Sequence, residues 1–426
     1  MTSQPKQAGA GRLQKPKVLL PMSAVLLGCN LFHLTSGNRT WVCGRAGPSP
    51  VRPALTAQRT NAATSRRSRR TARSATQTAE ADGEGIPRRL AIGAGVLAAT
   101  LAGTKKFLID GNMQELVLKA GSLTGKTIVI TGGNTGLGLE SAIRLAKAGA
   151  TVVITVRTDA KGMAAVEEVK QQSGSSNVHY LTLDLADLGS VKAFASKFEK
   201  QPYGDHIDVL LNNAGVMAIP TRILTKDGFE MQFGTNHLGH FALVATVLPL
   251  LKKATSGARI VNVSSTAHLP ATAADFQGDI MAPERYTQWG AYCTSKLANV
   301  LFSKELDRRF KAAGVPITAV SCHPGAINTD LTRWIIADGD AQAARSLVNG
   351  NPLLQVSNQV LGRPVNLGAN TQVYLAAGLD GGLDKSGGMY FDNMAPGLEN
   401  PVANDEAVAK TLWAESERLT GVKLTI

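Results

Sequence analysis

The stretch that decides the fold is Thr131-Gly132-Gly133-Asn134-Thr135-Gly136-Leu137-Gly138. It follows the apolar run Ile128-Val129-Ile130 and precedes a helix-like segment from Glu140 to Ala148. Glycine permits positive φ angles and lets the backbone approach a pyrophosphate, while the N–H groups at a helix start attract its negative charge. The order strand, glycine turn and helix therefore predicts a dinucleotide-binding unit of an α/β fold, with the spacing GxxxGxG instead of GxGxxG. The alternative is a glycine-rich turn that binds no ligand.

The end of the next apolar run indicates which dinucleotide this would be. In NAD-binding folds of this kind, an acidic residue near the end of the second strand holds the ribose 2′-hydroxyl. Here the run from Thr151 to Val156 is followed by Arg157. A guanidinium suits a 2′-phosphate, so we predict NADP(H) as the cofactor. A solvated surface arginine is the alternative.

A tyrosine and a lysine four residues apart predict acid/base chemistry. In Tyr292-Cys293-Thr294-Ser295-Lys296 the phenol and the ammonium share one helix face. A nearby ammonium favours the phenolate, so we expect Lys296 to lower the pKa of Tyr292. Such a pair is often ordinary surface spacing, and the other motifs give it its meaning.

Ser265 follows the apolar strand from Ile260 to Val263, where its hydroxyl could hydrogen-bond a substrate carbonyl; Ser264 is the alternative.

In combination, these motifs resemble the short-chain dehydrogenase/reductase family over roughly residues 122–426. The resemblance implies a single catalytic domain with a doubly wound Rossmann fold and a seven-stranded parallel sheet. It also implies a catalytic tetrad of Asn236, Ser265, Tyr292 and Lys296, in which Asn236 orders a water that passes protons to Lys296. Without the resemblance, Asn236 would belong only to a packed helix with two histidines. The cofactor-binding positions that we predict are Gly132, Asn134, Thr135, Gly136, Leu137, Gly138, Arg157, Asp184, Leu185, Asn213, Ala214, Gly215, Tyr292, Lys296, Pro324, Gly325 and Thr329.

Shorter segments resemble particular branches of this family. Residues 212–217, 235–241 and 292–302 are similar to the retinol-dehydrogenase-like branch, which includes a dehydrogenase associated with the chloroplast inner-envelope translocon. Residues 385–391 and 412–417 resemble light-dependent protochlorophyllide oxidoreductase, which shares the fold and the Tyr/Lys pair. Against that second likeness, Gly215 stands where that enzyme usually carries an alanine, and its long insertion before the tyrosine is absent. We therefore rank the retinol-dehydrogenase-like interpretation first and a protochlorophyllide reductase-like enzyme second.

The segment from Ala326 to Pro352 bears on the substrate. It carries the apolar residues Leu331, Trp334, Ile335, Ile336 and Leu347, and in the family this segment is a mobile lid over the substrate. Apolar side chains there favour a hydrophobic carbonyl or alcohol as the small-molecule partner. A packed helix pair is the alternative. Reduction of the carbonyl by NADPH is the expected direction.

Charge separates a basic leader from the part expected to fold. The first 90 residues hold 15 Lys and Arg against 3 Asp and Glu, so they carry +12 of the chain's formal +13. The remainder is nearly neutral, which argues against nucleic acid as a partner. We divide the chain into a targeting leader (1–89), an apolar segment and linker (90–120) and the NADP-binding domain (121–426). Such length suffices for one large α/β domain.

The leader predicts a location and a possible membrane association. It contains no acid before Glu80 and is rich in Ser, Thr, Ala and Arg from Thr60 to Arg73, as transit peptides are. We expect a plastid protein, in the stroma or at a membrane, with the mitochondrion as the alternative. The apolar run from Leu90 to Thr104 is shorter than the roughly 20 residues that span a bilayer, although Phe107-Leu108-Ile109 could extend it, so we expect residues 90–109 to associate with a membrane or to end a processed leader.

Other partners follow from the residue inventory and the resemblance. The seven histidines show no metal-ligand spacing, so we predict no metal. The family often forms dimers or tetramers, so a homo-oligomer is an expectation. The competing class of function is a binding protein that senses NADP(H) at a membrane translocon without turnover.

Overall fold

The centre of the protein is a sheet in which strands that are distant in sequence lie side by side. The computed structural model describes residues 113–325, 327, 337, 339–350 and 363–426, all within one unit, Leu101–Ile426. In this part of the chain the sheet has eight strands in the order β3-β2-β1-β4-β5-β6-β7-β8. Their bounds are β1 Thr127–Thr131, β2 Thr151–Val156, β3 Val178–Thr182, β4 Val209–Asn212, β5 Ala258–Val263, β6 Ile317–His323, β7 Tyr390–Asp392 and β8 Ala395–Pro396.

The predicted doubly wound α/β fold is confirmed, with one strand more than expected. Strands β1 to β7 pair in parallel, whereas β8 pairs antiparallel with β7. The extra strand arises because Asn393 and Met394 both have positive φ angles, of 49° and 63°. Two consecutive residues with positive φ angles form a tight hairpin turn, so the chain folds straight back onto β7.

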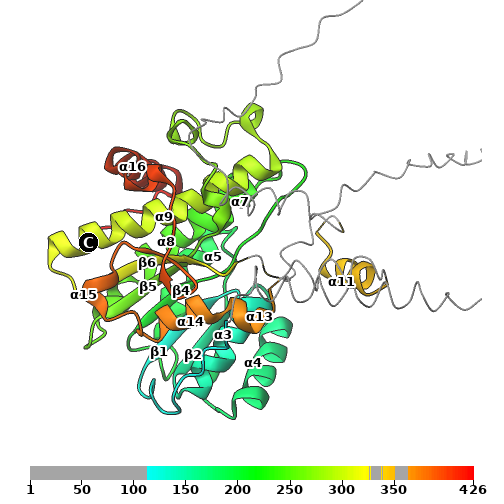
Figure 1. Cartoon of the computed structure of the whole chain (residues 1–426), viewed down its shortest axis with the longest axis vertical. Helices are drawn as coiled ribbons and strands as arrows, with labels where there is room; N and C mark the ends of the chain where they lie inside the picture. Colours follow the sequence, from blue (N-terminus) through cyan, green and yellow to red (C-terminus); the bar gives the residue numbers. More distant parts are fainter. Residues whose placement is uncertain (1–112, 326, 328–336, 338, 351–362) are drawn as a thin grey trace, which may run out of the picture. The chain divides into compact units, whose positions relative to one another are not determined.

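Helices cover both faces of the sheet (Figure 1). Helices α3 (Gly136–Lys147), α4 (Asp159–Ser173) and α14 (Asn370–Ala376) pack on one face. Helices α5 (Leu188–Lys192), α6 (Phe194–Glu199), α8 (Gly239–Lys252) and α9 (Gln288–Ala313) pack on the other, and α16 (Glu406–Thr420) lies against α9. Neighbouring strand residues alternate between the two cores, as in β1, where Val129 faces α8 and α9 while Ile128 and Ile130 face α3 and α14.

The remaining elements are short. They are α7 (Met231–Phe233), α11 (Ala341–Gly350), α13 (Val365–Gly368), α15 (Leu383–Ser386), the π-helix η1 (Gly234–Leu238) and the 3₁₀ turns η2 (Thr266–His268), η3 (Ala273–Phe276), η4 (Pro283–Arg285) and η6 (Pro401–Asn404). In the described residues, no helix combines the length and apolar character needed to cross a membrane.

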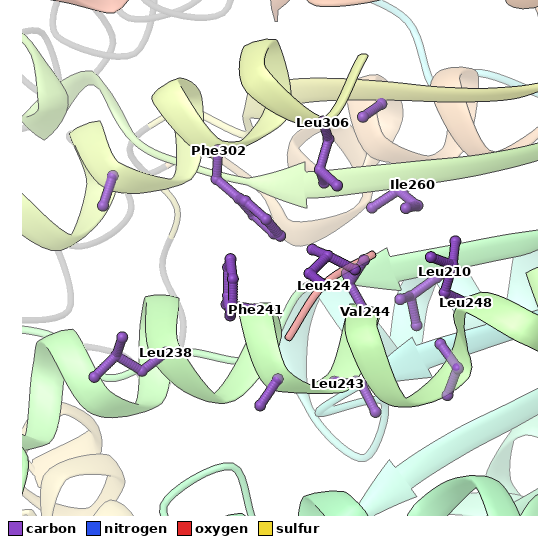
Figure 2. Close-up of a cluster of buried hydrophobic side chains, with 14 of the residues drawn as sticks. Leu210, Leu238, Phe241, Leu243, Val244, Leu248, Ile260, Phe302, Leu306 and Leu424 are labelled. Atoms are coloured by element: carbon purple, nitrogen blue, oxygen red, sulfur yellow. The ribbon is translucent and has the colours of Figure 1, made fainter. Parts of the chain in front are cut away.

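The larger core holds α8 and α9 in place. Figure 2 shows Phe241 of α8 pointing toward Phe302 of α9, next to Val244 and Leu306. The two rings lie 5.3 Å apart and are both buried. Truncating a buried phenylalanine typically costs about 3–5 kcal/mol, so this contact fixes the spacing of the two helices. Since α8 follows η1 and α9 carries Tyr292, that spacing also sets the geometry of the predicted site.

Part of the expected linker packs on the domain. The Leu116 N–H donates to Asn370 Oδ1 at 2.9 Å, and Asn370 Nδ2 donates to the Gln114 carbonyl at 2.8 Å. Leu116 and Leu118 contact the core beneath α3 and α14. The folded part therefore begins no later than Gln114, while the leader (1–89) and residues 90–112 lie outside the described residues.

Candidate active site

Most of the predicted site residues follow directly after parallel strands. Arg157 follows β2, Asp184 and Leu185 follow β3, and Asn213 to Gly215 follow β4. Ser265 follows β5, and Pro324 and Gly325 follow β6. The carboxyl ends of parallel strands meet at one edge of a sheet, where open α/β folds bind their ligands. Thr329 and the lid residues Leu331, Trp334, Ile335 and Ile336 lie outside the described residues, and Leu347 is an exposed residue of α11.

The glycine turn lets the protein backbone come close to a bound ligand. Gly132 and Gly136 have φ angles of 64° and 53°, which side chains rarely tolerate. A Cβ added to Gly138 would lie 2.5 Å from the Gly132 carbonyl oxygen and 2.6 Å from Asn213 Nδ2. In the described structure Thr135, the N-cap of α3, makes no side-chain capping bond, so the first N–H groups of the helix stay accessible. These features fit the pyrophosphate of a dinucleotide.

Side-chain hydrogen bonds tie this turn to the segment after β4. Thr131 Oγ1 accepts from the backbone N–H groups of Asn213 and Ala214, each at 2.9 Å, and Asn213 Nδ2 donates to the Thr131 carbonyl at 2.8 Å. Gln372 of α14 donates to the Leu137 carbonyl at 3.1 Å. The glycine turn and the Asn-Ala-Gly segment therefore form one rigid floor.

The flank of the site carries Arg157, which was predicted to select the cofactor, and Asp184 and Leu185, which were predicted to bind it. Arg157 is exposed beside the carboxyl end of β2, where a side chain can meet a ribose substituent. Asp184 Oδ1 accepts from the Ala186 N–H at 3.0 Å, which fixes this turn, and Leu185 is buried. Their strands β2 and β3 are neighbours in the sheet.

Of the two serines after β5, only one is available to a substrate. Ser264 is buried, and its hydroxyl donates to the Lys296 carbonyl at 2.7 Å. The Ser265 hydroxyl instead hydrogen-bonds the phenol of Tyr292. The geometry thus places Ser265, not Ser264, beside the tyrosine.

The side chains of Lys296 and Asn236 both approach Gly215, in the segment after β4. Lys296 Nζ donates to the Val263 carbonyl at 3.1 Å and lies 5.6 Å from the Tyr292 ring centroid. Asn236 Oδ1 accepts from the Val216 N–H at 2.8 Å, and its Nδ2 donates to the Val216 carbonyl at 2.9 Å. A Cβ on Gly215 would lie 3.2 Å from Asn236 Oδ1 and 3.6 Å from Lys296 Nζ, so the two side chains converge at this glycine.

The electrostatics of the Tyr292–Lys296 pair differ from the prediction. Burial raises the pKa of Tyr292 above its ordinary value, and the Ser265 hydrogen bond opposes this only in part. Burial also lowers the pKa of Lys296 to about 8. The expected depression of the tyrosine pKa by Lys296 was therefore wrong for this structure, because both groups are almost completely removed from water and each charged form loses solvation.

Asn236 occupies an unusual helical turn. The sequence alone suggests a packed helix, but residues Gly234–Leu238 form a π-helix between α7 and α8. Short π-helical turns are rare and are frequent at functional sites. Asn236 Nδ2 also donates to Ser295 Oγ at 3.0 Å, which links the π-helix to α9 next to Tyr292 and Lys296.

Two buried histidines hydrogen-bond the backbone carbonyls of two predicted catalytic residues. No role was predicted from the sequence for either histidine. His240 Nδ1 lies 3.0 Å from the Asn236 carbonyl, and His268 Nδ1 lies 2.6 Å from the Ser265 carbonyl. Burial lowers the pKa of each to about 4, so both are neutral at pH 7. A sequence signal existed, since His240 follows Asn236 by one helical turn and His268 follows Ser265 by three residues.

The turn after β6 is braced by another unpredicted residue. Gly325 has a φ angle of 89°, and Arg363 donates to the Pro324 carbonyl at 3.3 Å and to Asn393 Oδ1 at 2.8 Å. Within the described residues, no group of three or more His, Cys, Asp or Glu side chains is placed to hold a metal ion.

Comparisons with known proteins agree with this geometry. The family model for short chain dehydrogenases matches residues 126–339. Retinol dehydrogenase 13 of Homo sapiens is 38% identical over 324 residues, which cover 76% of this chain and 93% of that protein. Retinol dehydrogenase 12 of Homo sapiens is 38% identical over 334 residues, which cover 75% and 92%. A solved structure of an uncharacterised protein from Mycobacterium paratuberculosis is 35% identical, with a TM-score of 0.54, and covers 74% of this chain and 100% of that one.

A matched family model and relatives of this identity and coverage settle the class of protein. The family uses nicotinamide dinucleotides, which agrees with the glycine turn described above. The chain therefore belongs to the short-chain dehydrogenase/reductase family and is an oxidoreductase that acts on an alcohol/carbonyl pair.

Proposed function

We propose that this protein is an NADP(H)-dependent reductase that converts a hydrophobic carbonyl to its alcohol. The observation that carries the proposal is the convergence of Tyr292, Ser265, Lys296 and Asn236 beside the glycine turn. A phenol, a hydroxyl and an ammonium in one buried site are the groups that carbonyl reduction needs.

Each of the four residues has a task in this proposal. Tyr292, held neutral by burial, donates its proton to the carbonyl oxygen. Ser265, hydrogen-bonded to the phenol, holds the same oxygen as negative charge develops on it. Lys296 bonds the nicotinamide ribose and supports the phenolate left after proton transfer. Asn236, fixed to the Val216 backbone, orders the water through which a proton returns to Lys296.

The bound nicotinamide cofactor would supply the hydride. Support for NADP(H) over NAD(H) comes from Arg157, an exposed guanidinium after β2, at the position where NAD-binding folds place a carboxylate. The glycine turn and the Asn213 segment would hold the pyrophosphate and the adjacent ribose.

Support for an apolar substrate comes from the relatives and from the sequence. The relatives named above are retinol dehydrogenases by name, and the segment after the Pro324–Gly325 turn is rich in apolar residues. We therefore propose a retinoid-like or other apolar aldehyde as the substrate class.

We also propose that the basic leader directs the protein to a plastid, and that residues 90–109 bring it to a membrane surface. Imaging residues 1–112, which contain the leader (1–89) and most of the apolar segment and linker, fused to a fluorescent protein tests this proposal. A mitochondrial signal would refute the plastid assignment.

The function is tested by following NADPH absorbance with all-trans-retinal, medium-chain aldehydes and protochlorophyllide, the last in light and in darkness. Light-independent oxidation of NADPH by an aldehyde would support the proposal. Consumption only with illuminated protochlorophyllide would favour the protochlorophyllide reductase-like alternative. Tight NADPH binding without any turnover would favour the NADP(H)-sensing alternative.

The variant Tyr292→Phe separates catalysis from binding. It should keep NADPH binding and lose at least about 100-fold in turnover, because the proton donor is gone. The matched control is Tyr203→Phe, which removes the hydroxyl of a tyrosine whose ring packs against His179 and Phe198, before the amino end of β4. Full activity of Tyr292→Phe would refute the assignment.

A further inference from the structure

His240 lies between the cofactor floor and Asn236. Its side chain is 2% exposed, at the first turn of α8 directly after the π-helix. Nε2 lies 2.9 Å from Thr131 Oγ1, and Nδ1 lies 3.0 Å from the Asn236 carbonyl oxygen. Thr131 is 109 residues away in sequence, at the end of β1. One imidazole thus joins the strand that enters the glycine turn to the helix that carries Asn236.

The chemistry of the partners fixes the direction of these hydrogen bonds. A carbonyl oxygen can only accept, so Nδ1 of His240 must carry the proton. In the neutral imidazole, Nε2 is then an acceptor and receives the Thr131 hydroxyl proton. Thr131 Oγ1 accepts from the N–H groups of Asn213 and Ala214 and donates its own proton, for which Nε2 at 2.9 Å is a nearer acceptor than the Leu211 carbonyl at 3.5 Å. The series of hydrogen bonds therefore runs in one direction, from the Asn213 backbone N–H through Thr131 and His240 to the Asn236 carbonyl.

We propose that His240 is a positioning residue that couples the rigid floor formed by the glycine turn and the Asn-Ala-Gly segment to Asn236 through these directed hydrogen bonds. The proposal rests on the reductase function proposed above. It assigns to His240 two separable tasks: its Nδ1–H holds the π-helical turn of Asn236, and its Nε2 holds Thr131 and, through it, the Asn-Ala-Gly segment.

A neighbouring histidine shows what a purely structural role looks like. His237 is also buried, but its Nε2 lies 2.8 Å from Ser416 Oγ of α16. Its ring packs against Phe233 and Phe302 at centroid distances of 5.2 and 5.6 Å. His237 therefore braces α16 against the π-helix η1 and makes no contact with Thr131, so it is the matched control for His240.

Two amides test the two tasks of His240 separately. In His240→Asn the amide nitrogen can replace Nδ1, whereas in His240→Gln the amide oxygen can replace Nε2. We expect His240→Asn to keep kcat within about threefold and to weaken NADPH binding at least fivefold. We expect the reverse for His240→Gln. His240→Leu leaves both hydrogen-bond partners unsatisfied. It should lower kcat at least fivefold and weaken NADPH binding at least fivefold, as expected when buried polar groups lose their partners.

The measurements are NADPH affinity by fluorescence titration, kcat with all-trans-retinal, and the ring tautomer by ¹⁵N NMR of histidine-labelled protein. The His240 signal is identified by its loss in His240→Asn. We expect weaker NADPH binding in His240→Asn, a lower kcat in His240→Gln and a neutral His240 ring that is protonated at Nδ1. We expect His237→Asn to change neither NADPH affinity nor kcat. Equal effects of the two amides, or an Nε2–H ring, would overturn the proposal.

These measurements also separate this proposal from the reductase proposal. If the protein turns over no carbonyl, the reductase proposal fails, while NADPH affinity and the tautomer still decide the role of His240. If His240→Leu does not fold, the two amide variants and the tautomer suffice. A positive double-mutant coupling between His240→Gln and Asn236→Ala on kcat, absent with His237→Asn, would support the link to Asn236.

Discussion

Three buried histidines should make the folded protein sensitive to mild acid. His237, His240 and His268 are at most 2% exposed. Burial lowers their pKa values from the ordinary value of 6.5 to about 3, about 4 and about 4. Each folded-state value lies below the value in the unfolded chain. The unfolded state therefore takes up protons first as the pH falls, so the stability is at its full value above about pH 6.5 and is lost progressively between there and about pH 3–4.

The size of the loss follows from these shifts. One pKa unit corresponds to about 1.4 kcal/mol, and pH 5.5 lies one unit below the unfolded value. At pH 5.5 all three histidines remain mostly neutral when folded. Each therefore costs a little over 1 kcal/mol, and together they cost about 4 kcal/mol relative to pH 7.5. That is a large part of the roughly 5–15 kcal/mol by which domains are usually stable.

Urea unfolding at pH 7.5 and pH 5.5, followed by tryptophan fluorescence, measures this difference. The upper pH window avoids most carboxyl titration, which begins lower. In His237→Asn the difference between the two pH values should shrink by about one third, although the variant is less stable at both. An unfolding free energy that stays constant from pH 7.5 to 5.5 would refute the reasoning.

Further changes test the cofactor site and the core. Gly138→Ala brings a Cβ to 2.5 Å from the Gly132 carbonyl, so NADPH affinity measured by fluorescence should fall at least about tenfold; unchanged affinity would contradict the turn's role. Arg157→Ala should reduce the preference for NADPH over NADH, as the ratio of kcat/KM values, by about tenfold or more; an unaltered ratio would argue for a solvated arginine. Asp380→Ala leaves the buried guanidinium of Arg259 without its carboxylate partner. Its unfolding free energy in urea should drop by about 3–5 kcal/mol, and a loss below about 1 kcal/mol would contradict this.

The features that the sequence could predict are those set by local backbone requirements. The glycine turn is readable because Gly132 and Gly136 need positive φ angles and Gly138 has no room for a Cβ. The order strand, glycine turn and helix indicated an α/β fold, whereas the doubly wound sheet was implied by the resemblance to the family. The two-residue β8 escaped prediction because its turn contains no glycine, and Asn393-Met394 is a weak turn signal.

The features that escaped prediction depend on distant parts of the chain. Ser264 and Ser265 follow the same strand, and only the contact of Ser264 with the Lys296 carbonyl distinguishes them. The π-helix is too short to leave a periodic pattern. The role of His240 needs Thr131, a partner far away in sequence. The Tyr292–Lys296 spacing was visible, but the burial that governs their pKa values is a tertiary property.

That burial also bears on how the site works. If Lys296 simply depressed the pKa of Tyr292, the resting phenol would readily lose its proton. Burial instead keeps the proton on the phenol and makes Lys296, with a pKa of about 8, the group that exchanges protons near neutral pH. In the proposed reduction, a neutral phenol beside the Ser265 hydroxyl is the form that can donate a proton to the carbonyl oxygen. The phenolate formed after transfer would then be stabilised by charged Lys296 in the same dry site, where their attraction is strongest. In the mechanism proposed above, Asn236 acts after the chemical step, when Lys296 is reprotonated through the water that Asn236 orders, and the proposed contacts of His240 would serve that stage.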